Sequence, residues 1–329
     1  MTMESPQKNL ALDLVRVTES AALAASRWLG RGDKENGDKA AVDAMRISFS
    51  AIEIDGVVII GEGEKDKAPM LYNGERVGTG TGPKMDVAVD PVEGTRLLAN
   101  GRPNAISVVA LAPEGTMYNP GPAFYMKKLV VPKEANGKVD IGAPVSDNLK
   151  SVAKALNKDV DDLVVFVLDK PRHRGLIQEI REAGARIQLH TDGDVAGALM
   201  AVMPDTGVDI MMGTGGTPEG VLAAAAIRIM GGEMSGQLDP QSEAESRALL
   251  DAGYNLKEIL TTEDLIKSDD VFMAATGISG GTFLGGVEFT GKGARTYSMV
   301  LRGKTGTLRY IEAHHSFDKL MKISSIKYD

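Results

Sequence analysis

The sequence contains no cysteine in its 329 residues. That absence excludes disulfide scaffolds, cysteine-ligated zinc sites and thiol nucleophiles, and it fits a reducing cytoplasm, where we expect the protein to act. An excess of basic residues is lacking as well, because 37 Lys and Arg stand against 45 Asp and Glu, which gives a formal net charge of −8. We therefore expect no binding of nucleic acid through a basic face.

Long apolar runs are also missing. The best candidates, Leu163–Leu168 and Val221–Ala226, are far shorter than the roughly 20 residues of a membrane-spanning helix. Asp13, Arg16 and Glu19 interrupt the first apolar segment, so this segment does not resemble a secretory signal. We expect no association with a membrane.

Glycine, by contrast, is abundant. The chain has 38 glycines, roughly 12% of its residues against a usual share of about 7%. They stand in short clusters between periodic segments, where glycine permits a positive φ angle and lets the backbone approach a ligand closely. These clusters mark candidate binding loops.

The first part of the chain predicts a mixed layer of helices and sheet. Apolar residues recur at three- and four-residue steps over Leu10–Leu29, which predicts an amphipathic helix, and Asp38 is placed to open a second helix that runs to Phe49. Gly56–Gly61 is a short, continuously apolar segment, typical of a buried strand. Further strands are predicted at Val87–Val89, Ile106–Leu111 and Tyr125–Val131.

After Gly142, strands and helices alternate, which predicts a parallel or mostly parallel sheet covered by helices. The alternating segments are the strands Leu163–Leu168, Arg186–Leu189 and Val208–Met212 and the helices His173–Ala183, Asp194–Met203 and Pro218–Met230. A polar loop and helix are expected over Gln237–Asp251, and the last predicted strands are Val271–Ala275, Arg295–Leu301 and Thr307–Ile311. The chain is therefore of the α/β class, and we expect two sheet-containing halves, an α+β half of residues 1–142 and an α/β half of residues 143–329.

Acidic residues gather next to glycine in four segments, which are Gly61–Glu64, Asp90–Thr95, Asp192–Asp194 and Gly213–Gly220. Ligands of α/β proteins bind at the carboxyl ends of strands. Carboxylates gathered there repel one another unless a cation is bound, and oxygen ligands without His or Cys suit Mg²⁺ or Mn²⁺. Such an ion can bind a phosphate and activate water, which indicates phosphoryl chemistry.

Three of these segments also have a purely structural interpretation. Gly61–Glu64 is typical of a surface turn, and Asp192–Asp194 is typical of a helix N-cap with a turn glycine. Gly213–Gly220 is either a strand-to-helix connection or a phosphate site made of backbone N–H groups at a helix N-terminus. Asp90–Thr95 is more specific, because a turn that needs only Pro and Gly does not require two acids and a hydroxyl.

Three further motifs have weaker implications. Gly78–Gly82 follows no clear apolar strand, and Pro83-Lys84 stands where a helix would begin, so we expect a hairpin loop rather than a dinucleotide site. Lys170–His173 is a compact cationic segment that either holds a second phosphate or forms a solvated loop. His314-His315 is expected on the surface, without acidic partners.

Taken in order, these motifs resemble the class II fructose-1,6-bisphosphatases, bacterial members of the metal-dependent, lithium-sensitive phosphatase superfamily. The superfamily pattern is an early Asp, a Glu-containing motif, Asp-Pro-x-(Asp/Glu)-Gly-Thr and a late acid before a helix. Asp38, Glu62, Asp90–Thr95 and Glu219 match it. The likeness runs from about residue 11 to residue 309. Other matching segments are Val17–Ala22, Trp28–Lys34, Ala68–Tyr72, Lys170–His173, Asp192–Asp194 and Pro218–Gly220.

The resemblance implies a layered α/β/α/β/α sandwich of the sugar phosphatase type, with the site between its two halves. It implies hydrolysis of the 1-phosphate of D-fructose 1,6-bisphosphate to fructose 6-phosphate and phosphate, a reaction of gluconeogenesis. Mg²⁺ or Mn²⁺ is the implied cofactor, and a homodimer or homotetramer is the implied assembly. The half of residues 1–142 would carry most of the metal ligands, and the half of residues 143–329 would carry the substrate loops and Glu219.

The same resemblance implies roles for individual residues. The implied catalytic residues are Thr95, Asp38 and Glu219, of which Thr95 with Asp38 orients the attacking water. The implied metal ligands are Asp38, Glu62, Asp90, Glu93 and Glu219. The implied substrate contacts are Glu93, Gly94, Thr95, Tyr125, Lys170, Pro171, Arg172, Asp192, Gly193, Asp194 and Gly216.

Two features bear on how far the resemblance extends. Members of the family usually have the sequence Asn-Thr-Ala-Asp at the position of Glu35–Asp38 in this chain. The cysteine-bearing insertion of dual fructose/sedoheptulose bisphosphatases is absent between Gly82 and Asp90, which favours the single-substrate type. Sedoheptulose bisphosphate, inositol phosphate and a nucleotide 3′-phosphate remain alternative substrates. A non-catalytic protein that binds cations or sugar phosphates remains the alternative outside enzymes.

Overall fold

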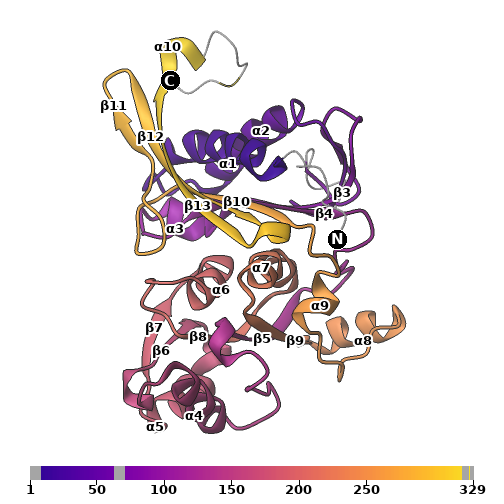
Figure 1. The fold of residues 1–329 in the computed structure, drawn as a ribbon, viewed down its shortest axis with the longest axis vertical. Coiled ribbons are helices and arrows are strands. Elements are labelled where there is room, and N and C mark those ends of the chain that lie inside the picture. The colour runs from indigo at the N-terminus through magenta and orange to yellow at the C-terminus, as the bar shows by residue number, and fades with distance from the viewer. Residues whose placement is uncertain (1–8, 63–70, 321–325, 327–329) are drawn as a thin grey trace, which may run out of the picture.

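The computed structural model describes residues 9–62, 71–320 and 326. The chain folds into alternating layers of helices, sheet, helices, sheet and helices (Figure 1), so the expected α/β/α/β/α sandwich is confirmed. The helices of the three helical layers are, from one outer face to the other, α1 (Leu10–Ser26) and α2 (Lys34–Phe49), then α6 (Asp194–Val202) and α7 (Thr217–Met230), then α4 (Val145–Leu156) and α5 (Arg174–Glu182).

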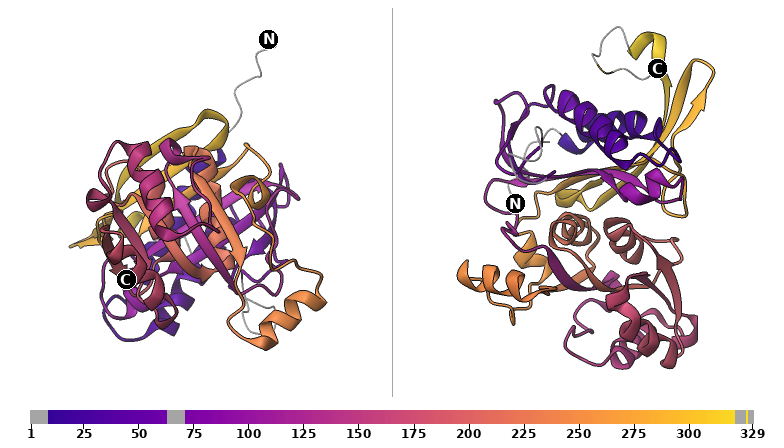
Figure 2. Two further views of the ribbon diagram at one scale, coloured as in Figure 1. Left: turned by 90° about the horizontal axis from the view of Figure 1, so that it is seen from below. Right: turned by 180° about the vertical axis from the view of Figure 1, so that it is seen from behind.

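The first sheet takes its strands from both ends of the chain. They are β1 (Asp55–Ile60), β2 (Arg76–Val77), β3 (Lys84–Glu93), β4 (Ile106–Pro113), β10 (Phe272–Gly277), β11 (Glu288–Thr290), β12 (Gly293–Arg302) and β13 (Thr307–Ser316). The order is β11-β12-β10-β4-β3-β1-β2, with β13 paired to β12. Figure 2 shows these N-terminal and C-terminal strands in one layer.

The second sheet is mostly parallel, as expected, with a single reversed strand. Its strands are β5 (Tyr125–Val131), β6 (Val164–Leu168), β7 (Arg186–His190), β8 (Ile210–Gly216) and β9 (Glu233–Leu238), in the order β7-β6-β8-β5-β9. β6 is parallel to β7 and to β8, as the alternating pattern predicts. However, β5 inserts between β8 and β9 and is antiparallel to both, because it enters from the earlier part of the chain.

The sheets divide the chain differently from the expected boundary at residue 142. β10 to β13 complete the first sheet beside β1 to β4, whereas β5 belongs to the second sheet. Residue 142 lies between β5 and α4, within the part of the chain that builds the second sheet. The chain therefore begins in the first sheet, builds the second and then returns.

Helix α2 begins earlier than expected. Asp33 is its N-cap, and the Asp33 carboxylate accepts a hydrogen bond of 3.0 Å from the backbone N–H of Asn36. The expectation that Asp38 opens this helix is therefore wrong, since Asp38 lies in the second turn. Its carboxylate does not cap the helix and lines the cavity described below.

The central helical layer is covered by a sheet on each side. In α7, Ala223, Ala224, Ala225 and Ala226 are all fully buried, because small side chains let both sheets approach the helix. The apolar core continues from these helices onto both sheets. This packing holds the N-termini of α6 and α7 in fixed positions between the sheets.

The loop Gly78–Gly82 and the two histidines of β13 differ from what the sequence predicts. Gly78–Gly82 does form a loop, but β2 and β3 on either side of it pair with β1 rather than with each other, so the loop is not a hairpin. His314 is exposed and lies 3.1 Å from Glu312. The His315 side chain is only 12% exposed and lies 3.8 Å from the Glu19 carboxylate. The expectation of two surface histidines without acidic partners is wrong, because successive residues of a strand point to opposite faces.

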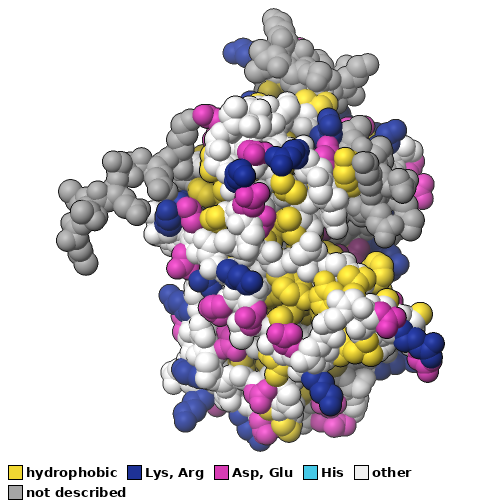
Figure 3. Space-filling view, turned by 90° about the vertical axis from the view of Figure 1, so that its right-hand side faces the viewer, with side chains coloured by type: hydrophobic (Ala, Val, Ile, Leu, Met, Phe, Trp, Pro, Cys, Tyr) yellow, Lys and Arg dark blue, Asp and Glu magenta, His cyan; other side chains and the backbone are white. Residues whose placement is uncertain are grey.

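The outer surface carries charges of both signs. On the face in Figure 3, Lys and Arg side chains are interspersed with Asp and Glu, and hydrophobic side chains gather near the middle. No helix in residues 9–62, 71–320 and 326 has the length and apolarity to span a bilayer.

Candidate active site

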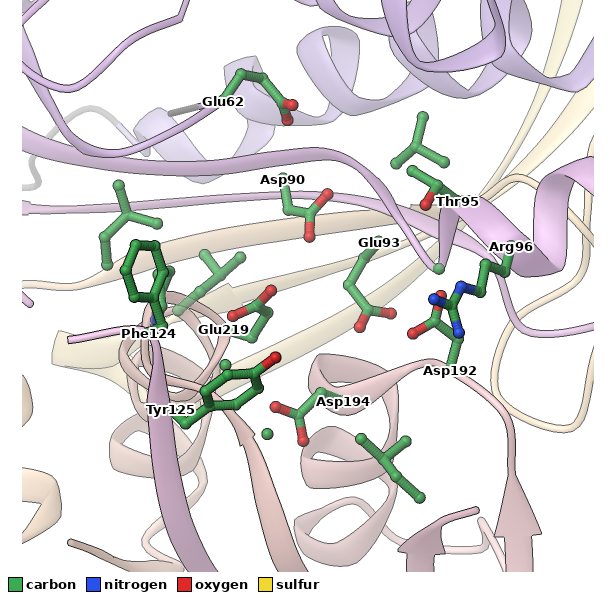
Figure 4. Close-up of a pocket in the computed structure, with 18 of the residues that line it drawn as sticks. Glu62, Asp90, Glu93, Thr95, Arg96, Phe124, Tyr125, Asp192, Asp194 and Glu219 are labelled. Atoms are coloured by element: carbon green, nitrogen blue, oxygen red, sulfur yellow. The ribbon is translucent and has the colours of Figure 1, made fainter. Parts of the chain in front are cut away.

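A cavity of about 880 Å³ opens between the two sheets, where β1, β3, β6 and β8 end (Figure 4). Most of the predicted site residues line it, although they come from distant parts of the chain. Pro171 and Gly193 do not line it but stand directly beside residues that do. Gly63, Glu64 and Ala68–Met70 lie outside the described residues. The predicted residues in the lining are Asp38, Glu62, Asp90, Glu93, Gly94, Thr95, Tyr125, Lys170, Arg172, Asp192, Asp194, Gly216 and Glu219.

An irregularity in β3 directs two acids into the cavity. Residues three apart in a regular strand point to opposite faces of the sheet. In β3, Asp90 pairs with Val108 and Glu93 pairs with Ile106, so three steps along β3 match only two along β4. This bulge turns both carboxylates to the same side, as Figure 4 shows. Gly94 follows with φ 89°, a left-handed conformation that favours glycine.

Asp38 and Glu62 form a hydrogen-bonded pair of carboxyl groups at the same cavity. Burial raises the pKa of Glu62 to about 8, helped by the charges of Asp38 and Glu219. Burial also raises the pKa of Asp38, while the hydrogen bond that Glu62 donates acts in the opposite direction. The backbone N–H of Glu62 donates to the carbonyl of Leu71 at 2.9 Å, which fixes the end of β1. Gly61 and Glu62 therefore line the cavity, whereas Gly63 and Glu64 of the same segment lie outside the described residues.

Glu93 is buried, Asp90 and Glu219 are half-buried, and two of these acids have an oxygen without a partner. Burial raises the pKa of Asp90, Glu93 and Glu219, and neighbouring carboxylates add to the shift. Glu93 Oε1 accepts a hydrogen bond of 3.1 Å from the backbone N–H of Val195. The other oxygen, Glu93 Oε2, is buried without a hydrogen-bond partner in the described structure, and so is Glu219 Oε2. Buried acceptors without partners are rare in native proteins.

This donor set fits a hard divalent cation. The acceptors are carboxylate oxygens, the ligands that Mg²⁺ and Mn²⁺ prefer. Within the described part of the chain, however, no group of three acidic or histidine side chains is already close enough to hold an ion.

The cationic loop after β6 is fixed by hydrogen bonds to neighbouring strands. It contains the short helix η3 (Pro171–His173). Lys170 Nζ donates to the carbonyl of Thr191 at 2.6 Å. His173 Nε2 accepts the Thr214 N–H at 2.8 Å, so His173 Nδ1 carries the proton and donates to Leu168 O at 2.6 Å. Burial lowers the pKa of His173, which keeps the ring neutral. The loop is therefore ordered at the cavity edge and is not a free solvated segment.

The segment Asp192–Asp194 leads into α6. Gly193 is the N-cap residue, with φ 104° and no side-chain capping hydrogen bond. Neither carboxylate is used for capping, and both line the cavity. In Figure 4, Asp192 lies beside Arg96, and Asp194 points toward Tyr125. These positions favour a role in binding.

The glycine-rich start of α7 lets two acids approach the backbone. A Cβ atom at Gly215 would collide with the Asp194 carboxylate, and one at Gly216 would collide with the Glu219 carboxylate. Gly213–Gly220 is thus a strand-to-helix connection that also forms one wall of the cavity.

Several residues at or beside the cavity were not predicted from the sequence, namely Lys34, Arg96, Phe124, Lys128 and Glu245. Lys34 lies one helical turn before Asp38, and Arg96 directly follows Thr95, so both positions offered a signal. Lys128 is a lysine inside a buried strand, which is also unusual. Glu245 lies in α8 (Glu243–Asp251), and no feature of its local sequence connects it with the site.

Comparison with known proteins agrees with the resemblance drawn from the motifs. Residues 8–315 match the family model described as bacterial fructose-1,6-bisphosphatase, glpX-encoded. Similar proteins include fructose-1,6-bisphosphatase 1 class 2 of Escherichia coli (strain K12) and fructose-1,6-bisphosphatase class 2 of Shigella flexneri. Each is 44% identical over 326 residues, which cover 95% of this chain and 97% of the relative. The chain belongs to the glpX-encoded family of bacterial class II fructose-1,6-bisphosphatases.

Proposed function

We propose that this protein hydrolyses the 1-phosphate of D-fructose 1,6-bisphosphate, with the help of divalent cations, to give fructose 6-phosphate and inorganic phosphate. Family membership supports the activity. The observation that carries it for this chain is the gathering of five carboxylates, those of Asp38, Glu62, Asp90, Glu93 and Glu219, around one cavity with fixed cations at its edge. The reaction is a step of gluconeogenesis.

Those five carboxylates are the ligands we propose for Mg²⁺ or Mn²⁺. The unpartnered buried oxygens of Glu93 and Glu219 support this choice. When bound, the cation neutralises phosphate charge and lowers the pKa of a water molecule.

The chain's own residues orient the reacting groups. The Thr95 hydroxyl lies beside Asp90 and Glu93 at the cavity wall (Figure 4), where it can donate a hydrogen bond to the attacking water or accept one from it. Asp38 accepts a proton from that water as the new phosphorus–oxygen bond forms. The bond to the sugar O1 breaks, and the departing alkoxide takes up a proton from solvent water. Backbone N–H groups at the start of α7, near Gly216, stabilise negative charge on the phosphoryl oxygens.

The rest of the substrate is held from the second sheet. Lys170 and Arg172 pair with the phosphate that is not cleaved, because charge-assisted hydrogen bonds are the strongest available for a phosphate. Asp192 and Asp194 accept hydrogen bonds from sugar hydroxyls, and Tyr125 lies beside them at the wall. This arrangement predicts a preference for bisphosphates over monophosphates.

A phosphate-release assay tests the proposal. Purified protein is incubated with fructose 1,6-bisphosphate, sedoheptulose 1,7-bisphosphate, inositol 1-phosphate or adenosine 3′,5′-bisphosphate, each with Mg²⁺, with Mn²⁺ or with EDTA. We expect cation-dependent release that is fastest from fructose 1,6-bisphosphate and lost in Glu219→Ala. Release from none of the four would favour a non-catalytic binding protein. A faster reaction with another substrate would reassign the specificity.

Location and assembly are further parts of the proposal. We expect a cytoplasmic enzyme, in keeping with a chain that contains no cysteine.

We also expect a homodimer or homotetramer. Within the described residues β13 pairs only with β12, so its other edge is open to pairing with a second copy of the chain. Light scattering coupled to size-exclusion chromatography measures the assembly, and a monomer at assay concentration would contradict it.

A further inference from the structure

Lys128 is a buried cation that the proposed mechanism does not use. It lies in the middle of β5, and its side chain is 1% exposed. On either side of it, Met126 and Val130 belong to the core around α6 and α7, whereas Leu129 and Val131 belong to the core against α4 and α5. The alternation of the strand therefore sends Lys128 toward α6 and α7, behind the cavity. A buried ammonium is unfavourable unless it is paired.

The partners of Lys128 stand at the start of the two central helices. The Lys128 ammonium forms an ion pair with Asp194 Oδ2 and donates a hydrogen bond of 2.6 Å to the carbonyl of Gly216. Asp194 is the first residue of α6, and Gly216 is the N-cap residue of α7. One side chain from the sheet thus holds the beginnings of both helices that face the cavity.

The ion pair leaves one oxygen of Asp194 available. Its Oδ1 atom is buried and has no hydrogen-bond partner in the described structure, while Asp194 itself lines the cavity. Val195, the next residue, donates its N–H to Glu93, so Asp194 is fixed from the backbone as well. Asp194 is therefore held as an acceptor aimed at whatever occupies the cavity.

We propose that Lys128 is a positioning residue for sugar binding, which holds Asp194 so that Asp194 Oδ1 accepts a hydrogen bond from a hydroxyl of the substrate. The inference rests on the proposed function, because it requires a hydroxylated phosphate ester in the cavity. Without the ammonium, the Asp194 carboxylate loses its partner and turns away from the neighbouring carboxylates. Substrate binding weakens as a result, while Asp90 and Glu93, which lie on β3, keep their positions beside the cleaved phosphate.

The test compares Lys128→Met with Lys127→Met. Methionine keeps the length and the apolar stem of lysine but removes the charge. Lys127 is the matched control, because it is the next residue of β5, points to the opposite face and donates to the carbonyl of Ile141 at 3.1 Å. We expect KM for fructose 1,6-bisphosphate to rise about 10-fold or more in Lys128→Met, with kcat reduced by less than about 3-fold, whereas Lys127→Met changes neither by more than about 2-fold.

A double-mutant cycle separates positioning from a general structural role. If Lys128 acts through Asp194, then Lys128→Met combined with Asp194→Asn has the same KM as Asp194→Asn alone, within about 2-fold. If instead the increase in KM of the double variant equals the product of the increases in the two single variants, the proposal is overturned. An unchanged KM in Lys128→Met overturns it as well.

Folding and function are checked in the same series. Circular dichroism and thermal unfolding verify each variant, and Lys128→Gln replaces Lys128→Met if the latter does not fold. If the unchanged protein releases no phosphate, the proposed function fails, and calorimetric titration with fructose 6-phosphate then decides this inference by itself. Equal Kd values for the unchanged protein and the Lys128 variant would reject it, and weaker binding by the variant alone would support it.

Discussion

The guanidinium of Arg172 donates two hydrogen bonds to the backbone carbonyl of Thr214, of 2.9 Å from Nε and 2.8 Å from Nη2. The same group lies 5.1 Å from the centre of the Tyr125 ring. Three strands of the second sheet, β6, β8 and β5, therefore meet at one cation. Because Arg172 is held at a fixed distance from the carboxylates across the cavity, it can select ligands by the separation of their two phosphates.

Arg172→Ala is expected to weaken the recognition of the second phosphate. A charge-assisted hydrogen bond contributes about 1.5–3 kcal/mol, so KM for fructose 1,6-bisphosphate should rise about 10- to 100-fold. KM for fructose 1-phosphate, which has no second phosphate, should change by less than about 2-fold. Steady-state kinetics with both substrates provide the measurement. The control is Arg174→Ala, which removes an exposed arginine that does not line the cavity. An equal increase in KM for both substrates in Arg172→Ala would contradict the assignment of Arg172 to the second phosphate.

Glu219→Gln is expected to separate activity from stability. The substitution keeps the shape of the side chain but removes a buried charge whose pKa is raised mainly by burial. Phosphate release should fall by about 100-fold or more, because a proposed cation ligand is lost. In EDTA at pH 8, the melting temperature should be equal to or higher than that of the unchanged protein, since an unfavourable buried charge is absent. A variant that melts well below the unchanged protein in EDTA would indicate a structural role instead.

The stability of the cation-free protein is expected to fall as pH rises between about 7 and 8.5. Burial raises the pKa of Glu62 from 4.5 to about 8, so the folded protein keeps a proton that the unfolded chain has already released. Asp90 and Glu93 are shifted in the same direction. This contribution to stability is complete below pH 4.5 and is lost as pH rises through about 8. The interval begins near pH 7 because three histidines have the opposite effect on stability at lower pH. Burial lowers the pKa values of His173, His190 and His315 below 6.5, so their contribution to stability increases as pH rises toward that value.

Thermal unfolding in EDTA across that interval provides the measurement. Glu62→Gln is the matched variant, and its melting temperature should depend less on pH. Added Mg²⁺ should raise the melting temperature of the unchanged protein more at pH 8.5 than at pH 7, because carboxylates bind the cation after they lose their protons. A cation-free protein whose stability increases over this interval would rule out the proposed origin of these shifts.

Two glycines in helices are expected to respond oppositely to substitution by alanine. A Cβ atom at Gly197, in α6, would collide with the fully buried ring of Phe166. Gly197→Ala should therefore destabilise the protein by about 1–3 kcal/mol. At Gly175, in α5, the corresponding position has no atom within 4 Å apart from its chain neighbours and the backbone of its own helix, so Gly175→Ala should stabilise by up to about 1 kcal/mol. Urea unfolding of both variants measures the difference, and destabilisation by both would show that the Phe166 contact is not the cause.

Local sequence determined the helices and strands whose patterns are strong. Helix α1 begins at Leu10, as its apolar spacing predicts, and α6 begins at Asp194, as predicted. The acidic motifs likewise contain residues that line the cavity, because ligands of α/β proteins bind at the carboxyl ends of strands. Comparison with known proteins then established the family.

Only the tertiary structure decided which segments pair and which side chains meet. No local pattern indicates that β5 inserts between β8 and β9, or that an irregularity in β3 turns Asp90 and Glu93 to one side. Nor does any local pattern indicate that Lys128 reaches the start of two helices. Periodicity depends on neighbours in the chain, whereas these features depend on contacts between residues tens of positions apart. The sequence therefore determined the chemical groups of the site, and the packing of the two sheets around α6 and α7 determined their arrangement.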